Sequence, residues 1–154
     1  MTDDGGEPAR DHARLPAVLP GMVERGHGRV INVVSSAGKH RWPNVSGYSV
    51  SKAAAIKLGE NLAPELAGTG VSVLNYHPGL VDLGLTRRQL EAGKTGDRHV
   101  DGVGAWMADQ RDGGRFTTPE DSSEMLVRLV TGEADALSGS YLTPEDDLSR
   151  LLGG

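Results

Sequence analysis

Blocks of apolar residues separated by polar segments run along the chain, and each block predicts one element. Residues 30–34 form a nearly continuous β-branched run, which is typical of a parallel strand buried on both faces. Residues 48–67 carry apolar side chains at helical spacing, and residues 71–76 form the next strand-like run. The predicted apolar stripe of the helix consists of Ser51, Ala55, Leu58, Leu62 and Leu66. The order strand, helix, strand predicts a right-handed parallel βαβ unit.

Prolines and glycines mark where the predicted helices end. Apolar residues recur at helical spacing over residues 9–25, but Pro16 and Pro20 interrupt them. We therefore expect a short or broken helix that ends near Gly26. Pro64 should kink or end the long helix between the two strands.

Two copies of a Thr-Pro-Glu-Asp sequence lie in the carboxyl-terminal third of the chain. The first, residues 118–121, offers a hydroxyl N-cap, a proline at the first helical position and acids in the first turn, so it predicts a helix that ends at Gly132. The apolar face of this helix consists of Met125, Leu126, Leu129 and Val130. The second copy, residues 143–146, follows a short strand expected at residues 139–142, and we interpret it as capping too.

Two segments show little periodicity. Residues 80–117 are rich in Gly, Asp, Arg and Lys, and they predict a long loop with one short helix near residues 103–109. Residues 102–107 come close to the G-x-G-x-x-G pattern of a phosphate-binding turn, but no strand precedes them, so we do not interpret them as one. Residues 1–8 are polar and are expected to be disordered.

Composition narrows the class of protein. The 154 residues suffice for one domain, and the absence of cysteine excludes disulfides and thiol catalysis. An excess of 21 acidic over 16 basic residues argues against a nucleic-acid partner. The sequence contains neither a signal peptide nor an apolar run of membrane-spanning length, so we expect no membrane partner and a cytoplasmic location.

The chemistry suggested by the sequence centres on Ser35, Tyr48 and Lys52. Tyr48 and Lys52 are four residues apart, one helical turn, and Ser35 follows a predicted strand at the end where ligands bind in open α/β sheets. A nearby cation favours an ionised phenol, so such a tyrosine can exchange a proton with a hydroxyl or carbonyl oxygen. Each residue alone is more often structural: a turn serine, a helix-start aromatic and a solvated lysine. Ser36 is the alternative to Ser35.

Other classes of site have weaker support. The histidines are dispersed, and a close pairing with a carboxylate such as His99 with Asp101 supplies too few ligands, so we expect no metal site. No G-x-S-x-G sequence surrounds a serine, which disfavours a serine hydrolase. Trp42 lies between Ser35 and Tyr48, and it either lines a substrate pocket or serves packing.

The ordered motifs resemble the short-chain dehydrogenase/reductase family. Asn32-x-x-Ser35, Tyr48-x-x-x-Lys52 and the Pro78-Gly79 turn have the order and spacing of that family, and the likeness covers about residues 15–86. It implies an α/β fold with a partial Rossmann-like parallel sheet and flanking helices. It also implies NAD or NADP as cofactor and an alcohol or carbonyl compound as small-molecule substrate.

The resemblance assigns roles to residues. Ser35 would hydrogen-bond the substrate oxygen, Tyr48 would transfer the proton, and Lys52 would hold the nicotinamide ribose and tune Tyr48. Tyr48 and Lys52 would thus also bind the cofactor, together with Pro78, Gly79 and Val81. Residues 80–117 would cover the substrate.

The sequence also departs from the family pattern. Only residues 1–14 precede the match, so we expect residues 9–154 to be the carboxyl half of a Rossmann-type domain without the glycine-rich βαβ units. The family threonine two residues after Val81 is replaced by Leu83, and Thr86 follows three residues later. The family's active-site asparagine would fall near Glu7, so its proton relay is expected to be missing.

Two functions follow from these observations. The leading one is an NAD(P)-dependent oxidoreductase of the short-chain dehydrogenase/reductase type. The alternative is a catalytically inactive truncated paralogue that acts by docking or oligomerising. Loss of the preceding strands would expose a sheet edge, so we expect a homo-oligomer or docking to a full-length homologue.

Overall fold

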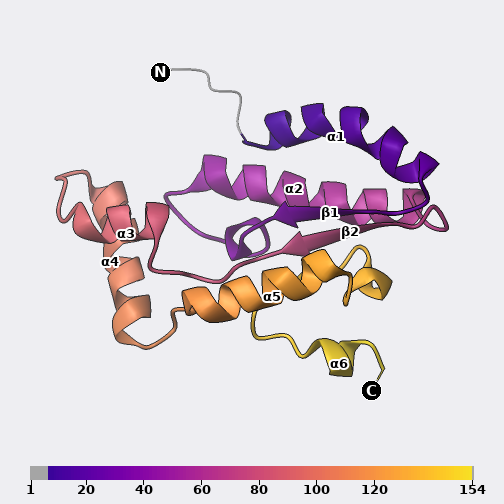
Figure 1. The fold of residues 1–154 in the computed structure, drawn as a ribbon. Helices are drawn as coiled ribbons and strands as arrows, with labels where there is room; N and C mark the ends of the chain where they lie inside the picture. Colours follow the sequence, from indigo (N-terminus) through magenta and orange to yellow (C-terminus); the bar gives the residue numbers. More distant parts are fainter. Residues whose placement is uncertain (1–6, 154) are drawn as a thin grey trace.

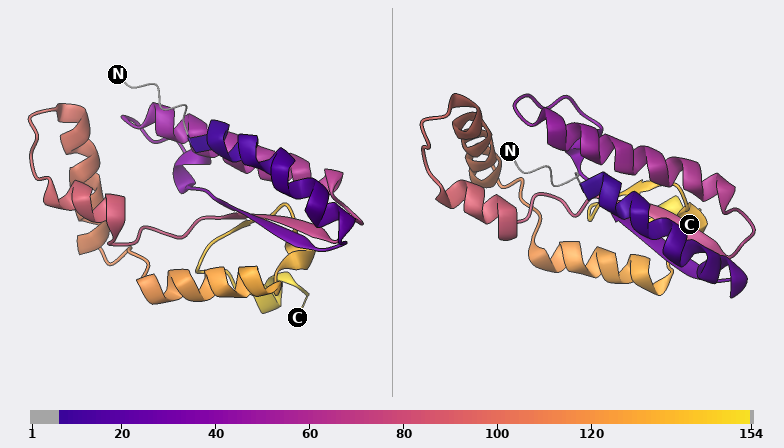
Figure 2. Two further views of the ribbon diagram at one scale, coloured as in Figure 1. Left: turned by 45° about the horizontal axis from the view of Figure 1, so that its top comes forward. Right: turned by 90° about the horizontal axis from the view of Figure 1, so that it is seen from above.

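The computed structural model describes residues 7–153, and the side chains of residues 14–153. A parallel sheet lies between α1 (Glu7–Glu24) and α2 (Ser46–Glu65) on one side and α5 (Pro119–Thr131) on the other. This α/β arrangement of a parallel sheet with flanking helices confirms the predicted fold class (Figure 1, Figure 2). Among the described helices, none is long and apolar enough to cross a bilayer.

The sheet has the strand order β1-β2-β3, and both pairings are parallel. Strands β1 (Gly28–Val33) and β2 (Val71–Tyr76) pair in register from end to end, with Gly28 opposite Val71. Strand β3 (Tyr141–Leu142) adds two residues beside the end of β2. The predicted βαβ unit is therefore present, and the bounds of its second strand are those expected.

The strand β1 is more exposed than predicted. We expected burial on both faces, yet the side chain of Val33 is 54% exposed. Within the described residues β1 pairs only with β2 and so forms an edge of the sheet. Every residue of β2, which has a neighbour on each side, is buried instead. A β-branched run thus predicts the strand but not its place in the sheet.

The helix α1 is continuous over 18 residues, so the expectation of a short or broken helix was wrong. Pro16 and Pro20 lie inside it, and each removes one backbone donor. Packing along α2 holds the helical path despite this loss (Figure 2). Most of the segment predicted to be disordered, residues 1–6, lies outside the described residues.

The helix α2 ends one residue after Pro64, as predicted. Its buried residues are Ile56, Gly59 and Ala63. The residues of the predicted apolar stripe lie beside them and are only half-buried. Two of the three buried residues, Gly59 and Ala63, are small, and the backbone of α2 approaches the sheet closely at Gly59. A Cβ on Gly59 would collide with the side-chain oxygen of Asn75 in β2.

Residues 80–117 are mostly helical, whereas we expected a long loop with only one short helix near residues 103–109. They form α3 (Gly84–Glu91) and α4 (Arg98–Asp112), which stand beyond the carboxyl ends of the strands (Figure 1). Asp97 caps α4 by accepting hydrogen bonds from the amides of His99 and Val100. Residues 102–107 lie inside α4, so they form no phosphate-binding turn.

The helix α5 begins and ends as predicted. The Thr118 hydroxyl accepts from the amide of Asp121, and Gly132 ends the helix with a φ of 95°. Met125 and Leu129 are buried, whereas Leu126 and Val130 of the predicted face are exposed. The core cluster beneath α5 also includes Leu74, Tyr76, Ala134, Leu142 and Leu148.

The second Thr-Pro-Glu-Asp copy does not start a helix. The carboxylate of Asp146 instead accepts hydrogen bonds from both the backbone amide and the hydroxyl of Thr143. The following α6 (Leu148–Leu151) is capped by Asp147 instead. The tetrapeptide therefore closes a turn here, because the aspartate one position later has the capping geometry.

Candidate active site

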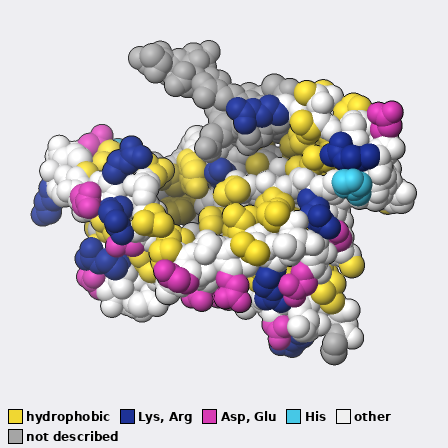
Figure 3. Space-filling view, in the orientation of Figure 1, with side chains coloured by type: hydrophobic (Ala, Val, Ile, Leu, Met, Phe, Trp, Pro, Cys, Tyr) yellow, Lys and Arg dark blue, Asp and Glu magenta, His cyan; other side chains and the backbone are white. Residues whose placement is uncertain are grey.

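A cavity of about 710 Å³ opens at the carboxyl ends of β1 and β2. Side chains from α2, α3, α4 and the start of α5 complete its wall. Figure 3 shows hydrophobic side chains gathered in the hollow where the α3–α4 end meets the body of the molecule. The cavity brings together the residues proposed from the sequence, namely Ser35, Tyr48, Lys52, Pro78, Gly79 and Val81.

Ser35 is held by the short 3-10 helix that follows β1. Its side chain is 6% exposed, and its Oγ accepts a hydrogen bond of 3.2 Å from the amide of Ala37. Gly38 ends this turn against α2, where a Cβ would lie 2.7 Å from the backbone nitrogen of Ala53. Glycine thus allows the Ser35 turn to pack directly on the helix that carries Tyr48 and Lys52.

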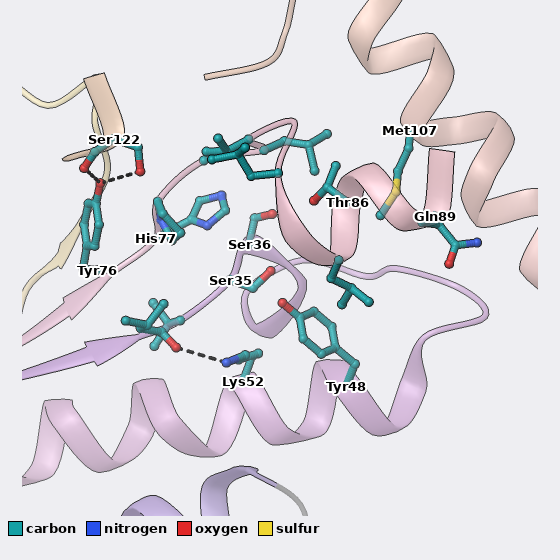
Figure 4. Close-up of a pocket in the computed structure, with 18 of the residues that line it drawn as sticks. Ser35, Ser36, Tyr48, Lys52, Tyr76, His77, Thr86, Gln89, Met107 and Ser122 are labelled. Atoms are coloured by element: carbon teal, nitrogen blue, oxygen red, sulfur yellow. Dashed lines mark hydrogen bonds between the residues drawn. The ribbon is translucent and has the colours of Figure 1, made fainter. Parts of the chain in front are cut away.

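Tyr48 and Lys52 occupy the first two turns of α2. The Lys52 Nζ lies 5.7 Å from the centroid of the Tyr48 ring and donates a 3.1 Å hydrogen bond to the carbonyl oxygen of Val33. In Figure 4 the hydroxyl groups of Ser35 and Tyr48 point toward one another. All three residues line the cavity, with the two hydroxyls close to one another and the ammonium directed at the carbonyl oxygen of Val33. Ser36, the alternative serine, lines the cavity as well.

The Pro78-Gly79 turn is fixed against the segment before α5. Gly79 has a φ of 81°, and a Cβ there would collide with the side chain of Thr117. The amide of Thr117 donates a 3.0 Å hydrogen bond to the carbonyl oxygen of Leu80. The backbone of the turn is thus held at the cavity wall, with Val81 following it.

His77 contributes a neutral imidazole to the cavity wall. Burial lowers its pKa, and the nearby Glu145 carboxylate opposes this shift only in part. Its Nδ1 has no hydrogen-bond partner among the described residues. The side chain therefore supplies a polar atom without a fixed charge.

The structure adds cavity residues on α3 and α4 that the sequence reasoning missed. Thr86, Gln89, Val103, Trp106 and Met107 line the cavity, and several are labelled in Figure 4. The helical spacing of the last three residues was the signal that could have found them. A short helix was expected near residues 103–109, but its apolar residues were not assigned to a site.

Trp42 has both of the positions considered from the sequence, in a cavity wall and in a packing contact. It lines the cavity and also packs against Trp106, with ring centroids 4.4 Å apart and planes inclined by 58°. Nearby, His99 Nδ1 and the side-chain oxygen of Asn44 are 2.7 Å apart. These contacts join α4 to the loop that precedes α2.

Two other sequence features lie outside the cavity lining. Asn32 donates a 3.1 Å hydrogen bond to Asn75, which in turn donates to the carbonyl oxygen of Ile56, so this pair links the strands to α2. Asp101 accepts from the amide of Thr95. Within residues 14–153 no group of three potential ligands among His, Cys, Asp and Glu could hold a metal ion.

Comparison with known proteins identifies the family. Residues 14–94 match the family described as short chain dehydrogenase. The chain belongs to the short-chain dehydrogenase family. The NADP-dependent 3-hydroxy acid dehydrogenase YdfG of Escherichia coli (strain K12) is 49% identical over 67 residues, which are 42% of this chain and 26% of that one.

Two further comparisons cover more of this family member. A protein of Xanthobacter autotrophicus named inactive 2-(S)-hydroxypropyl-CoM dehydrogenase 2 is 33% identical over 88% of this chain and 57% of its own length. The crystal structure of NAD+-bound xylitol dehydrogenase superposes with a TM-score of 0.68 and 26% identity, over 88% of this chain and 59% of that chain. The chain thus spans at most about three fifths of the length of these three relatives.

Proposed function

We propose that this chain provides the proton-transfer side of a nicotinamide-dependent oxidoreductase that interconverts a hydroxyl and a carbonyl group. The convergence of Ser35, Tyr48 and Lys52 in one cavity at the carboxyl edge of the sheet is the observation that carries the proposal. Membership of a family whose relatives are named dehydrogenases supports it.

Each of the three side chains has a separate role in this proposal. Ser35 donates a hydrogen bond to the substrate oxygen, and Tyr48 gives a proton to that oxygen during carbonyl reduction or takes it during alcohol oxidation. The Lys52 ammonium stabilises the phenolate form of Tyr48 and binds ribose hydroxyls. When bound, the nicotinamide supplies or accepts the hydride.

The residues of the cavity fit one end of a dinucleotide cofactor. Pro78, Gly79 and Val81 line the wall and would lie against the nicotinamide ring. The described residues contain no strand, glycine turn and helix that would hold the pyrophosphate. The proposal therefore assigns only the nicotinamide and its ribose to this cavity, with either NAD or NADP as cofactor.

A fluorescence titration tests cofactor binding. We predict that NADH, NADPH or both give a saturable change in nicotinamide fluorescence, and that Lys52→Met weakens binding by about tenfold or more through loss of a charge-assisted hydrogen bond. Lys57→Met is the matched control, because Lys57 pairs with Glu60 on the same helix and does not line the cavity. A titration in which neither nucleotide binds would contradict the proposal.

The open edge of β1 supports a second proposal, that two copies of the chain associate. Edge strands expose backbone donors and acceptors that pair readily with another strand. Within the described residues the outer side of β1 has no neighbouring strand. Sedimentation velocity over a range of concentrations should show a dimer, and a monomer at every concentration argues against this association.

A further inference from the structure

The charge on the cavity wall is unusually sparse. Of the described residues that line it, only Lys52 carries a full charge, and none is Asp, Glu or Arg. The remaining polar side-chain groups are hydroxyls, the amide of Gln89, the imidazole of His77 and the indole N–H groups of Trp42 and Trp106. Most of the surface that a substrate would meet is therefore aliphatic or aromatic.

The charge of Lys52 lies at the reacting end of the cavity. Its Nζ donates a hydrogen bond to the carbonyl oxygen of Val33 and lies near the ring of Tyr48. Figure 4 places Gln89 and Met107 at the other end, where α3 and α4 form the wall. A group on the far side of the substrate would thus meet Leu85, Trp106 and Met107 rather than a cation.

The arginines of α3 do not supply the missing positive charge. Arg87 donates to the Asp82 carboxylate, with Nε 3.2 Å from Oδ1, and also to the Asp82 carbonyl oxygen. Neither Arg87 nor Arg88 lines the cavity. A carboxylate at the α3–α4 end of the cavity would consequently meet the amide of Gln89 and apolar side chains but no counter-ion, which is unfavourable.

We infer that the substrate is an uncharged and largely apolar ketone or secondary alcohol. Its oxygen would lie at Ser35 and Tyr48, and its body would lie against the indoles of Trp42 and Trp106. This inference rests on the proposed function and specifies its substrate class. It also separates this chain from the relative named as a 3-hydroxy acid dehydrogenase.

The chain carries its own reporter of substrate binding. Its only two tryptophans are Trp42 and Trp106, and both line the cavity. Their fluorescence can therefore follow binding without turnover and without reduced cofactor. Suitable probes are levulinate, methyl levulinate and cyclohexyl levulinate, three keto compounds that differ in charge and apolar bulk but not in the ketone.

The titration is performed on the whole chain, with and without NADP+. We expect methyl levulinate to bind at least about tenfold more tightly than levulinate, because one methyl group alone accounts for only about fourfold. Cyclohexyl levulinate should bind about tenfold more tightly again. Equal affinities, tighter binding of levulinate, or no saturable change with any probe would each overturn the inference.

Two variants test where in the cavity the keto compounds bind. Gln89→Arg places a cation on the far wall and should shift the preference toward levulinate by about tenfold. Trp106→Ala should weaken binding of cyclohexyl levulinate by about tenfold, with Trp42 remaining as the reporter. Val127→Ala, at an exposed position outside the cavity, is the control. These readouts do not require turnover, so failure here is distinguishable from failure of nicotinamide binding.

Discussion

Ser35 shows how single residues set the geometry of the site. Its Oγ accepts from the amide of Ala37, and the absence of a side chain at Gly38 lets the turn contact α2. The glycine at position 79 has the same effect on the turn after β2, where a methyl group would strike Thr117. Close backbone approach, rather than the reactive side chains alone, brings the two turns to one cavity.

At the residue scale, His77 predicts a dependence of stability on pH. Burial lowers its folded-state pKa below the ordinary value of 6.5, so the unfolded chain binds a proton more readily. Neutral His77 therefore makes its full contribution to the free energy of unfolding above about pH 6.5. This contribution is lost, and the protein becomes less stable, as the pH falls toward the folded-state pKa. Denaturant melts between neutral and mildly acidic pH measure this fall.

The comparison of variants isolates the contribution of His77. His77→Gln should make the loss of stability below about pH 6.5 smaller than in the unaltered chain. The control is His40→Gln, which changes an exposed histidine and should keep the full loss. Identical pH profiles for the unaltered chain and His77→Gln would show that the imidazole is not desolvated.

At the scale of elements, the sequence predicted what depends on local patterns. The buried run of β2 and the capping of α5 depend on neighbouring residues, so their bounds were predictable. The exposure of β1 depends on which strands lie beside it. The continuity of α1 depends on its packing against α2. A short helix was expected near residues 103–109, but glycines concealed α3 and the full length of α4. The cavity wall that these two helices form was therefore missed.

The contact between α2 and the sheet gives a prediction for Gly59. Gly59→Ala should lower the free energy of unfolding by about 1–3 kcal/mol, because its methyl group would displace the buried amide of Asn75 and lie 2.8 Å from the Asn32 Nδ2. Gly47→Ala on the same helix meets no atom within 4 Å. It should leave stability unchanged or raise it by less than about 1 kcal/mol. Chemical denaturation compares the two, and equal effects would refute the close approach.

At the scale of the whole molecule, the site lies where three parts of the chain meet. The βαβ unit contributes Ser35, Tyr48 and Lys52, while the α3–α4 pair and the start of α5 close the cavity around them. The ordered motifs made the first group predictable, since local sequence fixes its spacing. The second group depends on tertiary contacts such as the tilted ring contact between Trp42 and Trp106, which no local pattern specifies.

Turnover by the 154-residue chain tests the central claim most directly. The measurement is the oxidation of NADH and NADPH with a panel of neutral ketones, for the unaltered chain and for Tyr48→Phe. We predict turnover with at least one pair, and a loss of about a hundredfold or more in Tyr48→Phe with a much smaller effect on nicotinamide binding, because the proton donor is removed. Absence of turnover with every pair, or a Tyr48→Phe variant as active as the unaltered chain, would contradict the assignment of this cavity as an oxidoreductase site.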